Sequence, residues 1–207
     1  MKNFLAVCLL VLVSSCSNTE ESDYKFSTNS IVVYGNLHLV ESNILSNEAL
    51  NEQLPTVVAT QRWLYDTVSE DIVLIEGFPC DSQFTLEHYK NYFKEKFGYE
   101  MKSGTLDTLK EYCPKYDVET RFILEGKKII FGAEYDSLYN LVVEAVNKNP
   151  KFNLSQELID VRSVAIAENA KAISMRYKKK VAVVVGDNHL QWFSDHGFTV
   201  YHPPALR

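Results

Sequence analysis

Five short apolar runs rich in β-branched residues recur along the chain and predict the strands of a sheet. They occupy residues 30–35, 71–77, 127–134, 179–187 and 198–202. Within each run the apolar residues follow one another instead of alternating with polar ones, so both faces of these strands are expected to be covered.

Stretches with helical periodicity lie between the runs and predict the layers that cover the sheet. Residues 137–146 and 154–177 are two of them, and Pro55 is expected to open a third in its first turn, continuing through residues 56–68. Strands alternating with helices predict an α/β domain with a largely parallel central sheet flanked by helices and joined by right-handed crossovers.

A less regular segment, residues 81–125, interrupts this alternation. Residues 85–98 and 103–113 within it have the pattern of helices and are rich in tyrosine and phenylalanine. We expect them to form a small helical cap over the sheet edge. Residues 30–207 are therefore predicted to be a single α/β domain with a helical cap insertion.

The amino-terminal segment has the pattern of an export signal. Lys2 is followed by an apolar run from residue 4 to residue 13, which is too short to span a bilayer as a helix. The sequence LVSSC, which ends at Cys16, resembles the lipobox of bacterial lipoproteins. That resemblance implies that residues 1–15 are a signal peptide and that Cys16 carries the lipid; an ordinary secretory signal is the alternative.

A lipid on Cys16 would anchor the protein to the bacterial cell envelope, at the periplasmic or the surface face of the outer membrane. Residues 16–29 are polar and are expected to be a tether. Outside the cytoplasm a disulfide between Cys80 and Cys113 is permitted. Neither of these two cysteines belongs to a CxxC pattern, which argues against a cysteine metal site.

The charge balance narrows the set of partners. The chain has 27 acidic and 21 basic side chains and a net charge of −6, which argues against binding to nucleic acid or, by electrostatics, to an anionic lipid surface. The one basic run, residues 176–180, follows a predicted helix. Cations favour the negative end of a helix dipole, so we interpret this run as a solvated helix terminus.

Polar side chains stand where four of the predicted strands end. They are His38, Glu76, Glu134 and His189, and each histidine closes the same short pattern, Gly-x-x-His. Ligands of open α/β sheets bind outside the carboxyl ends of the strands. Two imidazoles and one or two carboxylates there predict a divalent metal site, for zinc, manganese or cobalt. The alternative is that each side chain only caps a helix or forms hydrogen bonds.

The helix at residues 154–177 carries polar groups on its apolar face. Arg162, Ile166, Asn169 and Ile173 fall on one stripe at helical spacing. A buried guanidinium needs a partner, so Arg162 is expected to pair with a carboxylate such as Glu76 or Glu134, or with an anionic group of a substrate. In the alternative orientation of the helix, Arg162 and Glu168 face solvent.

Five segments in this order resemble the motifs of the TraB/GumN/TIKI proteins. They are YGNLHLVES, IVLIEG, KKIIFGAEYDSLYN, VRSVAIAENAKAI and VAVVVGDNHLQWFSDHGFTVYHP. The erythromycin-esterase and ChaN-like haem-binding proteins are similar in part. The resemblance implies a metal-dependent hydrolase or protease that uses His38, His189 and either Glu76 or Glu134. The chain departs from the family pattern at Ser163 and Asn188.

The function that this resemblance implies is hydrolysis of an ester or peptide bond in a peptide or small-molecule substrate. His38, His189 and Glu76 would hold a metal ion that polarises a carbonyl group and lowers the pKa of a bound water molecule. The second glutamate, Glu134, would take the proton, and Arg162 would orient a carboxylate or stabilise the oxyanion.

Further residues are expected to support this site. Asp187 and Asn188 would fix the orientation of the imidazole, and Asn169 would lie behind the ligands. His88, His196 and His202 are expected at the surface, and Trp192 in the core.

Two other functions remain open from the sequence. One is a metal-independent hydrolase in which a histidine acts as general base with Glu76 or Glu134. The other is a lipid-anchored protein of ChaN-like type that binds haem or another ligand and catalyses no reaction.

Overall fold

A computed structural model describes most of the α/β domain. The described residues are 26–37, 47–79, 83–97, 118–135 and 155–204, together with Ser137, Leu138, Asn140, Leu141, Glu144 and Lys148. The signal segment, Cys16, His38, the pair Cys80 and Cys113 and the predicted helix at 103–113 lie outside the described residues.

Five parallel strands form the centre of the molecule, which confirms the predicted α/β architecture. The strands are β1 (Ile31–Asn36), β2 (Ile72–Pro79), β3 (Ile129–Glu134), β4 (Val181–Gly186) and β5 (Thr199–Tyr201). Their order in the sheet is β3-β2-β4-β1-β5, so the strand that comes fourth in the chain lies in the middle.

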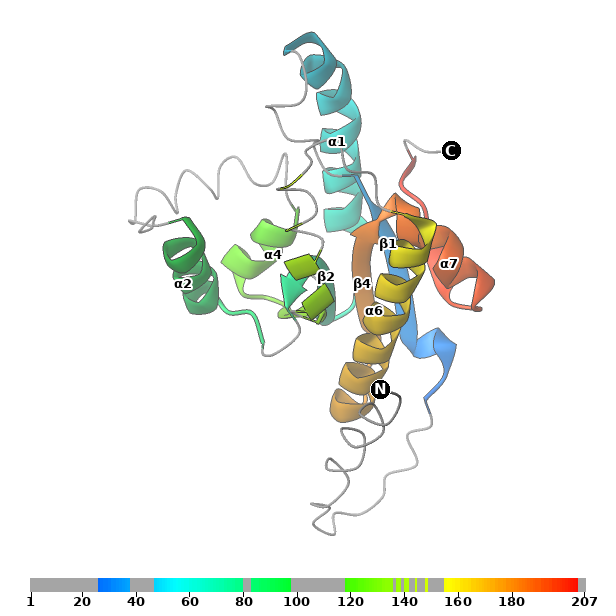
Figure 1. Cartoon of the computed structure of the whole chain (residues 1–207). Helices are drawn as coiled ribbons and strands as arrows, with labels where there is room; N and C mark the ends of the chain where they lie inside the picture. Colours follow the sequence, from blue (N-terminus) through cyan, green and yellow to red (C-terminus); the bar gives the residue numbers. More distant parts are fainter. Residues whose placement is uncertain are drawn as a thin grey trace, which may run out of the picture.

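Helices cover the sheet on both sides (Figure 1). They are α1 (Asn47–Thr67), α2 (Leu86–Phe97), α4 (Val118–Glu125), α6 (Gln156–Tyr177) and α7 (Leu190–Asp195), with short 3-10 turns η1 (Thr28–Ser30) and η2 (Asp187–His189). The five described residues of 137–146 are helical, as predicted for that segment, and so is Lys148. No helix among the described residues has the length and hydrophobicity to cross a membrane.

Pro55 does not open α1, contrary to the prediction. The helix begins eight residues earlier, at Asn47, and Pro55 lies inside it with an exposed side chain. The preceding sequence, NEALNEQL, consists mostly of good helix formers, so the helix continues through a residue that lacks an amide hydrogen.

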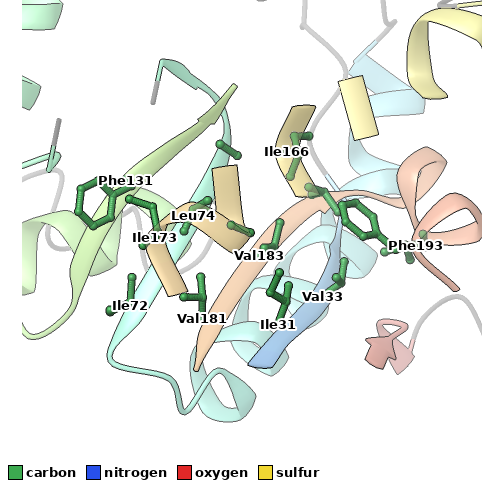
Figure 2. Close-up of a cluster of buried hydrophobic side chains, with 14 residues drawn as sticks. Ile31, Val33, Ile72, Leu74, Phe131, Ile166, Ile173, Val181, Val183 and Phe193 are labelled. Carbon is green, nitrogen blue, oxygen red and sulfur yellow. The ribbon is translucent and has the colours of Figure 1, made fainter. Parts of the chain in front are cut away.

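Each face of the sheet has its own hydrophobic core. Figure 2 shows the first, where Ile166 and Ile173 of α6 and Phe193 of α7 pack against strand residues such as Val33 and Val183. Residues of α1, α2 and α4 form the second core with the opposite side chains of the same strands. The two cores follow from strands that are apolar on both faces.

The described part of the segment expected to form a cap packs on a face of the sheet. Val118, Phe122 and Ile123 of α4 are buried in the second core together with Val73 and Ile75 of β2. A helix of only eight residues is not stable by itself in water, so the burial of these residues stabilises α4.

Helix α6 has well-defined ends. The Ser155 hydroxyl caps its start by accepting a hydrogen bond from the amide of Leu158 at 3.3 Å, and Lys178 ends it in the left-handed conformation with φ of 54°. Arg176 and the three lysines that follow Tyr177 are exposed. This confirms that residues 176–180 form a solvated helix terminus.

Candidate functional site

Two glutamates lie at the carboxyl edge of the sheet because β2 bulges there. Ile75 is paired with Gly132, but Pro79 is paired with Glu134, so three residues of β2 oppose a single residue of β3. Gly77 lies in this bulge with φ of +83°, a conformation that favours glycine. Glu76 precedes Gly77 in this bulge, and its side chain reaches the same guanidinium as Glu134.

Arg162 of α6 joins the two carboxylates. Its Nε donates to Oε2 of Glu134 at 2.9 Å, and its Nη2 donates to Oε1 of Glu134 at 2.6 Å and to Oε1 of Glu76 at 2.7 Å. Arg162 is 4% exposed, whereas Glu168 is exposed. The predicted pairing is confirmed, and the orientation with Arg162 in solvent is wrong.

Backbone amides complete the hydrogen bonding of the carboxylates. The amide of Gly77 donates to Oε1 of Glu134 at 3.0 Å, and the amide of Gly186 donates to Oε2 of Glu76 at 2.5 Å. Burial alone would favour the neutral acid at Glu76. Contact with His189, the charge of Arg162 and the Gly186 amide outweigh burial and hold the pKa of Glu76 well below its usual range.

His189 lies directly behind Glu76. It is 2% exposed, and its Nε2 is 3.3 Å from Oε1 of Glu76. On the other side of the ring, Nδ1 is 2.7 Å from the hydroxyl of Ser163, which also donates to the carbonyl oxygen of Ile159 at 2.8 Å. The two ring nitrogens thus contact Ser163 and Glu76 rather than Asp187 and Asn188, which are exposed.

The Ser163 hydroxyl decides where the imidazole proton lies, because it has one hydrogen and two neighbours. When it donates to Ile159, its oxygen accepts a hydrogen bond from Nδ1–H of His189. Nε2 contacts Glu76 as a donor when it carries a proton, and it is in this state that His189 lowers the pKa of Glu76. Once this proton has left, the lone pair of Nε2 can accept a proton again and form an imidazolium next to the carboxylate, as a general base does.

Asn169 fixes α6 to the strand that carries Glu134. Its Nδ2 donates to the carbonyl oxygen of Ala133 at 2.9 Å, and its side chain is buried. Arg162, Ile166, Asn169 and Ile173 are all buried, so the polar stripe faces the sheet as predicted.

The structure brings together four of the residues singled out in the sequence: Glu76, Glu134, Arg162 and His189. His38 lies outside the described residues; the chain is described as far as Leu37, and Asn36 lies opposite Gly186 in the sheet. His88, His196 and His202 are exposed as predicted, and Trp192 is partly buried against the first core, where it stacks on His196 at 3.9 Å.

The two glycines of the Gly-x-x-His patterns are needed for close packing. A Cβ at Gly35 would lie 2.6 Å from Cδ1 of Leu190, and a Cβ at Gly186 would lie 3.3 Å from Oε2 of Glu76. Neither glycine has a positive φ. Their role is thus to let a side chain approach the strand end.

Ser163 is a site residue that the sequence interpretation missed. It is fully buried between His189 and the helix backbone. Its position carries a signal, because Ile159, Ser163, Ile166 and Ala170 share one helical stripe, on which a serine is the polar exception.

A second polar cluster, also missed, fixes the end of β1 to α1 and α4. Nε2 of Gln61 donates to Oδ1 of Asn36 at 2.7 Å and to the carbonyl oxygen of Leu37 at 3.1 Å, and its Oε1 accepts from the amide of Val118 at 2.8 Å. Nδ2 of Asn36 donates to Oε1 of Glu119 at 3.0 Å. This cluster holds the carboxyl end of β1 in place.

The described members of the predicted metal site do not fit a divalent ion well. Oε1 of Glu76 already accepts from Arg162 and contacts His189, and the guanidinium supplies the positive charge that both glutamates need. A divalent ion bound to Oε1 of Glu76 would lie next to the positively charged guanidinium of Arg162, which would repel it. Among the described residues, no three His, Cys, Asp or Glu side chains are grouped to hold a metal.

No family model, no curated protein and no solved structure matches the chain. The resemblance to the TraB/GumN/TIKI proteins therefore stays a prediction.

Proposed function

We propose that this protein is a hydrolase of the bacterial cell envelope that cleaves an ester or peptide bond through the Glu76–His189 pair, without a metal ion on these two residues. The observation that supports it is the 3.3 Å contact between Nε2 of His189 and Oε1 of Glu76, within a buried network at the carboxyl edge of a parallel sheet. Open α/β sheets bind their ligands at that edge.

The two members of the pair have different tasks. The side chain of Glu76 is 15% exposed, compared with 2% for His189, so water reaches the network at the carboxylate. The lowered pKa of Glu76 means that this carboxylate does not keep a proton. The imidazole behind it accepts the proton at Nε2.

Arg162 keeps the pair in position and retains donors for the substrate. Its Nε and Nη2 bind the two glutamates, and Nη1 makes no hydrogen bond to any described residue. Nη1 is thus available to the oxygen of the carbonyl group under attack, where negative charge develops.

The reaction follows from these positions. A water molecule next to Glu76 attacks the carbonyl carbon of the substrate, and its proton passes by way of the Glu76 carboxylate to Nε2 of His189. The bond to the leaving oxygen or nitrogen then breaks, and the proton moves from His189 to the leaving group. The products are a carboxylic acid and an alcohol or an amine.

Two isosteric variants test this proposal. Glu76→Gln and His189→Asn should each lower kcat on p-nitrophenyl esters or on a fluorogenic peptide library by roughly 10²-fold or more, the usual contribution of acid–base catalysis. The exposed residue His196 lies outside the network, so His196→Asn is the matched control and should keep full activity.

Chelation separates this proposal from the metal-dependent alternative. Activity that persists after dialysis against a strong chelator supports the proton-transfer pair. Loss of activity that added zinc, manganese or cobalt restores would contradict it and would favour a metal site that includes His38.

The envelope location in this proposal depends on the lipid at Cys16. Its support is the lipobox-like sequence, followed by a polar stretch that leads to the first described residue, Phe26. Mass spectrometry of the mature protein should show a diacylglyceryl group on Cys16, and Cys16→Ala should move the protein from the membrane fraction to the soluble fraction. An unmodified Cys16 would reject the anchor and leave the proposed chemistry untouched.

A further inference from the structure

The amino-terminal edge of the sheet, opposite the candidate site, collects segments from distant parts of the chain. Ile31 is paired with Val181, and Ile72 is paired with both Val181 and Ile129. The residues that precede these four strands therefore lie at one edge. In Figure 1, η1 and the carboxyl-terminal end of α6 both lie at this end of the molecule.

Basic side chains dominate this edge. Six of them precede β3 and β4 and form what we call the basic rim: Lys127, Lys128, Arg176, Lys178, Lys179 and Lys180. Four acidic side chains, Glu70, Asp71, Glu125 and Asp195, also lie within five residues before a strand. The edge thus has an excess of two positive charges in a chain whose net charge is −6.

Most of the rim is available to a partner. The side chain of Lys127 is 75% exposed and that of Lys179 is 53% exposed, and their ion pairs with Glu125 and Asp71 lie at the surface, where such pairs are weak. Among the described residues, Lys178 and Lys180 have no ion-pair partner. Only Lys128 points inward, where its Nζ donates to two backbone carbonyl oxygens.

The chain enters the domain at the same edge. Phe26 packs against the first core, and Nζ of Lys171 on α6 lies 5.2 Å from its ring. Cys16 precedes Phe26 by ten residues. Ten extended residues span at most about 35 Å, so a lipid on Cys16 would keep this edge close to the membrane.

We propose that the basic rim binds the anionic headgroups of the membrane that holds the anchor, and that this contact turns the candidate site toward the side away from the bilayer. Clusters of lysine and arginine next to an anchor add to its hold on anionic lipid. The negative net charge argues against such binding only for the chain as a whole, because it does not show where basic side chains are clustered. The inference rests on the proposed anchor at Cys16.

Lysine labelling on vesicles tests the surface with the full chain. The lipidated protein is bound to vesicles of phosphatidylcholine alone or with phosphatidylglycerol, and the rate of modification by an amine-reactive reagent is followed at each lysine. Lys127, Lys178, Lys179 and Lys180 should react about threefold or more slowly on the anionic vesicles, since each basic residue near such a surface is attracted to it. Lys94 on α2, outside the rim, should react equally on both.

Salt and charge reversal sharpen the test. The protection should disappear at about 0.5 M NaCl, where charges are screened beyond roughly 5 Å. Lys178→Glu/Lys180→Glu should remove the protection of Lys127 and Lys179, and the control Lys90→Glu/Lys94→Glu, with the same change in net charge, should keep it. The proposal would be overturned if both double variants lost the protection equally. It would also be overturned if the rim lysines of the unchanged protein were modified at equal rates on both vesicle types.

Two further measurements distinguish membrane binding by the lipid anchor from membrane binding by the basic rim. Flotation with phosphatidylcholine vesicles reports the anchor alone. A chain without lipid should still float with phosphatidylglycerol vesicles at low salt if the rim binds them, and failure to do so would reject the surface. Protection of the rim lysines without vesicles would also reject it, because the acidic residues of the tether would then cover the rim.

Discussion

At the residue scale, the buried charges around Arg162 are the main energetic feature of the site. Arg162→Met leaves Glu76 and Glu134 buried without their cation, which should lower the free energy of unfolding by about 3–5 kcal/mol. The matched control is Lys179→Met, which removes an exposed pair with Asp71 and should change it by about 1 kcal/mol or less. Urea denaturation measures both, and similar values for the two variants would contradict the assignment.

Ser163 acts on the reaction only through His189, so its effect should appear in kcat. Ser163→Ala removes the acceptor for Nδ1–H, and we expect kcat to fall by roughly tenfold or more with KM nearly unchanged. Ser174→Ala on the same helix is the control, because that hydroxyl is also buried but donates to the carbonyl oxygen of Lys179. If both variants lost kcat equally, Ser163 would be a structural residue only.

The sequence predicts that the side chains of the site lie close together, but it does not predict which hydrogen-bond partners they have. Parallel strands place their carboxyl ends at one edge, so Glu76, Glu134 and His189 were expected together, and a buried arginine required a carboxylate. The sequence does not show which buried polar groups meet across the core. The contacts Ser163–His189 and Gln61–Asn36 each join residues that are 25 or more positions apart.

At the scale of secondary structure elements, all five strands were predicted to within two residues, since continuous apolar runs leave little choice of conformation. The errors fall where tertiary packing outweighs local signals. Helix α4 forms on the second core from a short segment without a clear pattern, and α1 continues across Pro55.

The proline inside α1 gives a prediction for that helix. Pro55→Ala restores an amide hydrogen to an exposed helical position and should raise the free energy of unfolding by about 1–3 kcal/mol. Ala59→Gly, one turn further on and also exposed, should lower it by about 1 kcal/mol. Thermal unfolding measures both changes. A less stable Pro55→Ala variant would show that the proline is accommodated without loss.

At the scale of the whole molecule, the Glu76 carboxylate makes stability depend on pH. Its pKa is lowered in the folded protein, so the unfolded chain binds more protons once the pH falls below the ordinary glutamate pKa of 4.5. Stability that is fully present above that pH is lost as the pH falls further, by up to about 1.4 kcal/mol per pH unit from this one group. Glu76→Gln should flatten the dependence between about pH 4.5 and pH 2, and an unchanged slope would mean that the folded carboxylate is not held in its charged form.

The central position of β4 has a consequence for biogenesis. Because β4 separates β1 from the pair β2–β3, these two parts of the sheet cannot join until residues 181–186 have been synthesised. Nearly nine-tenths of the polypeptide is then already made. A nascent chain of this topology therefore stays open for most of its synthesis, and its sheet is completed only when the last strands are added.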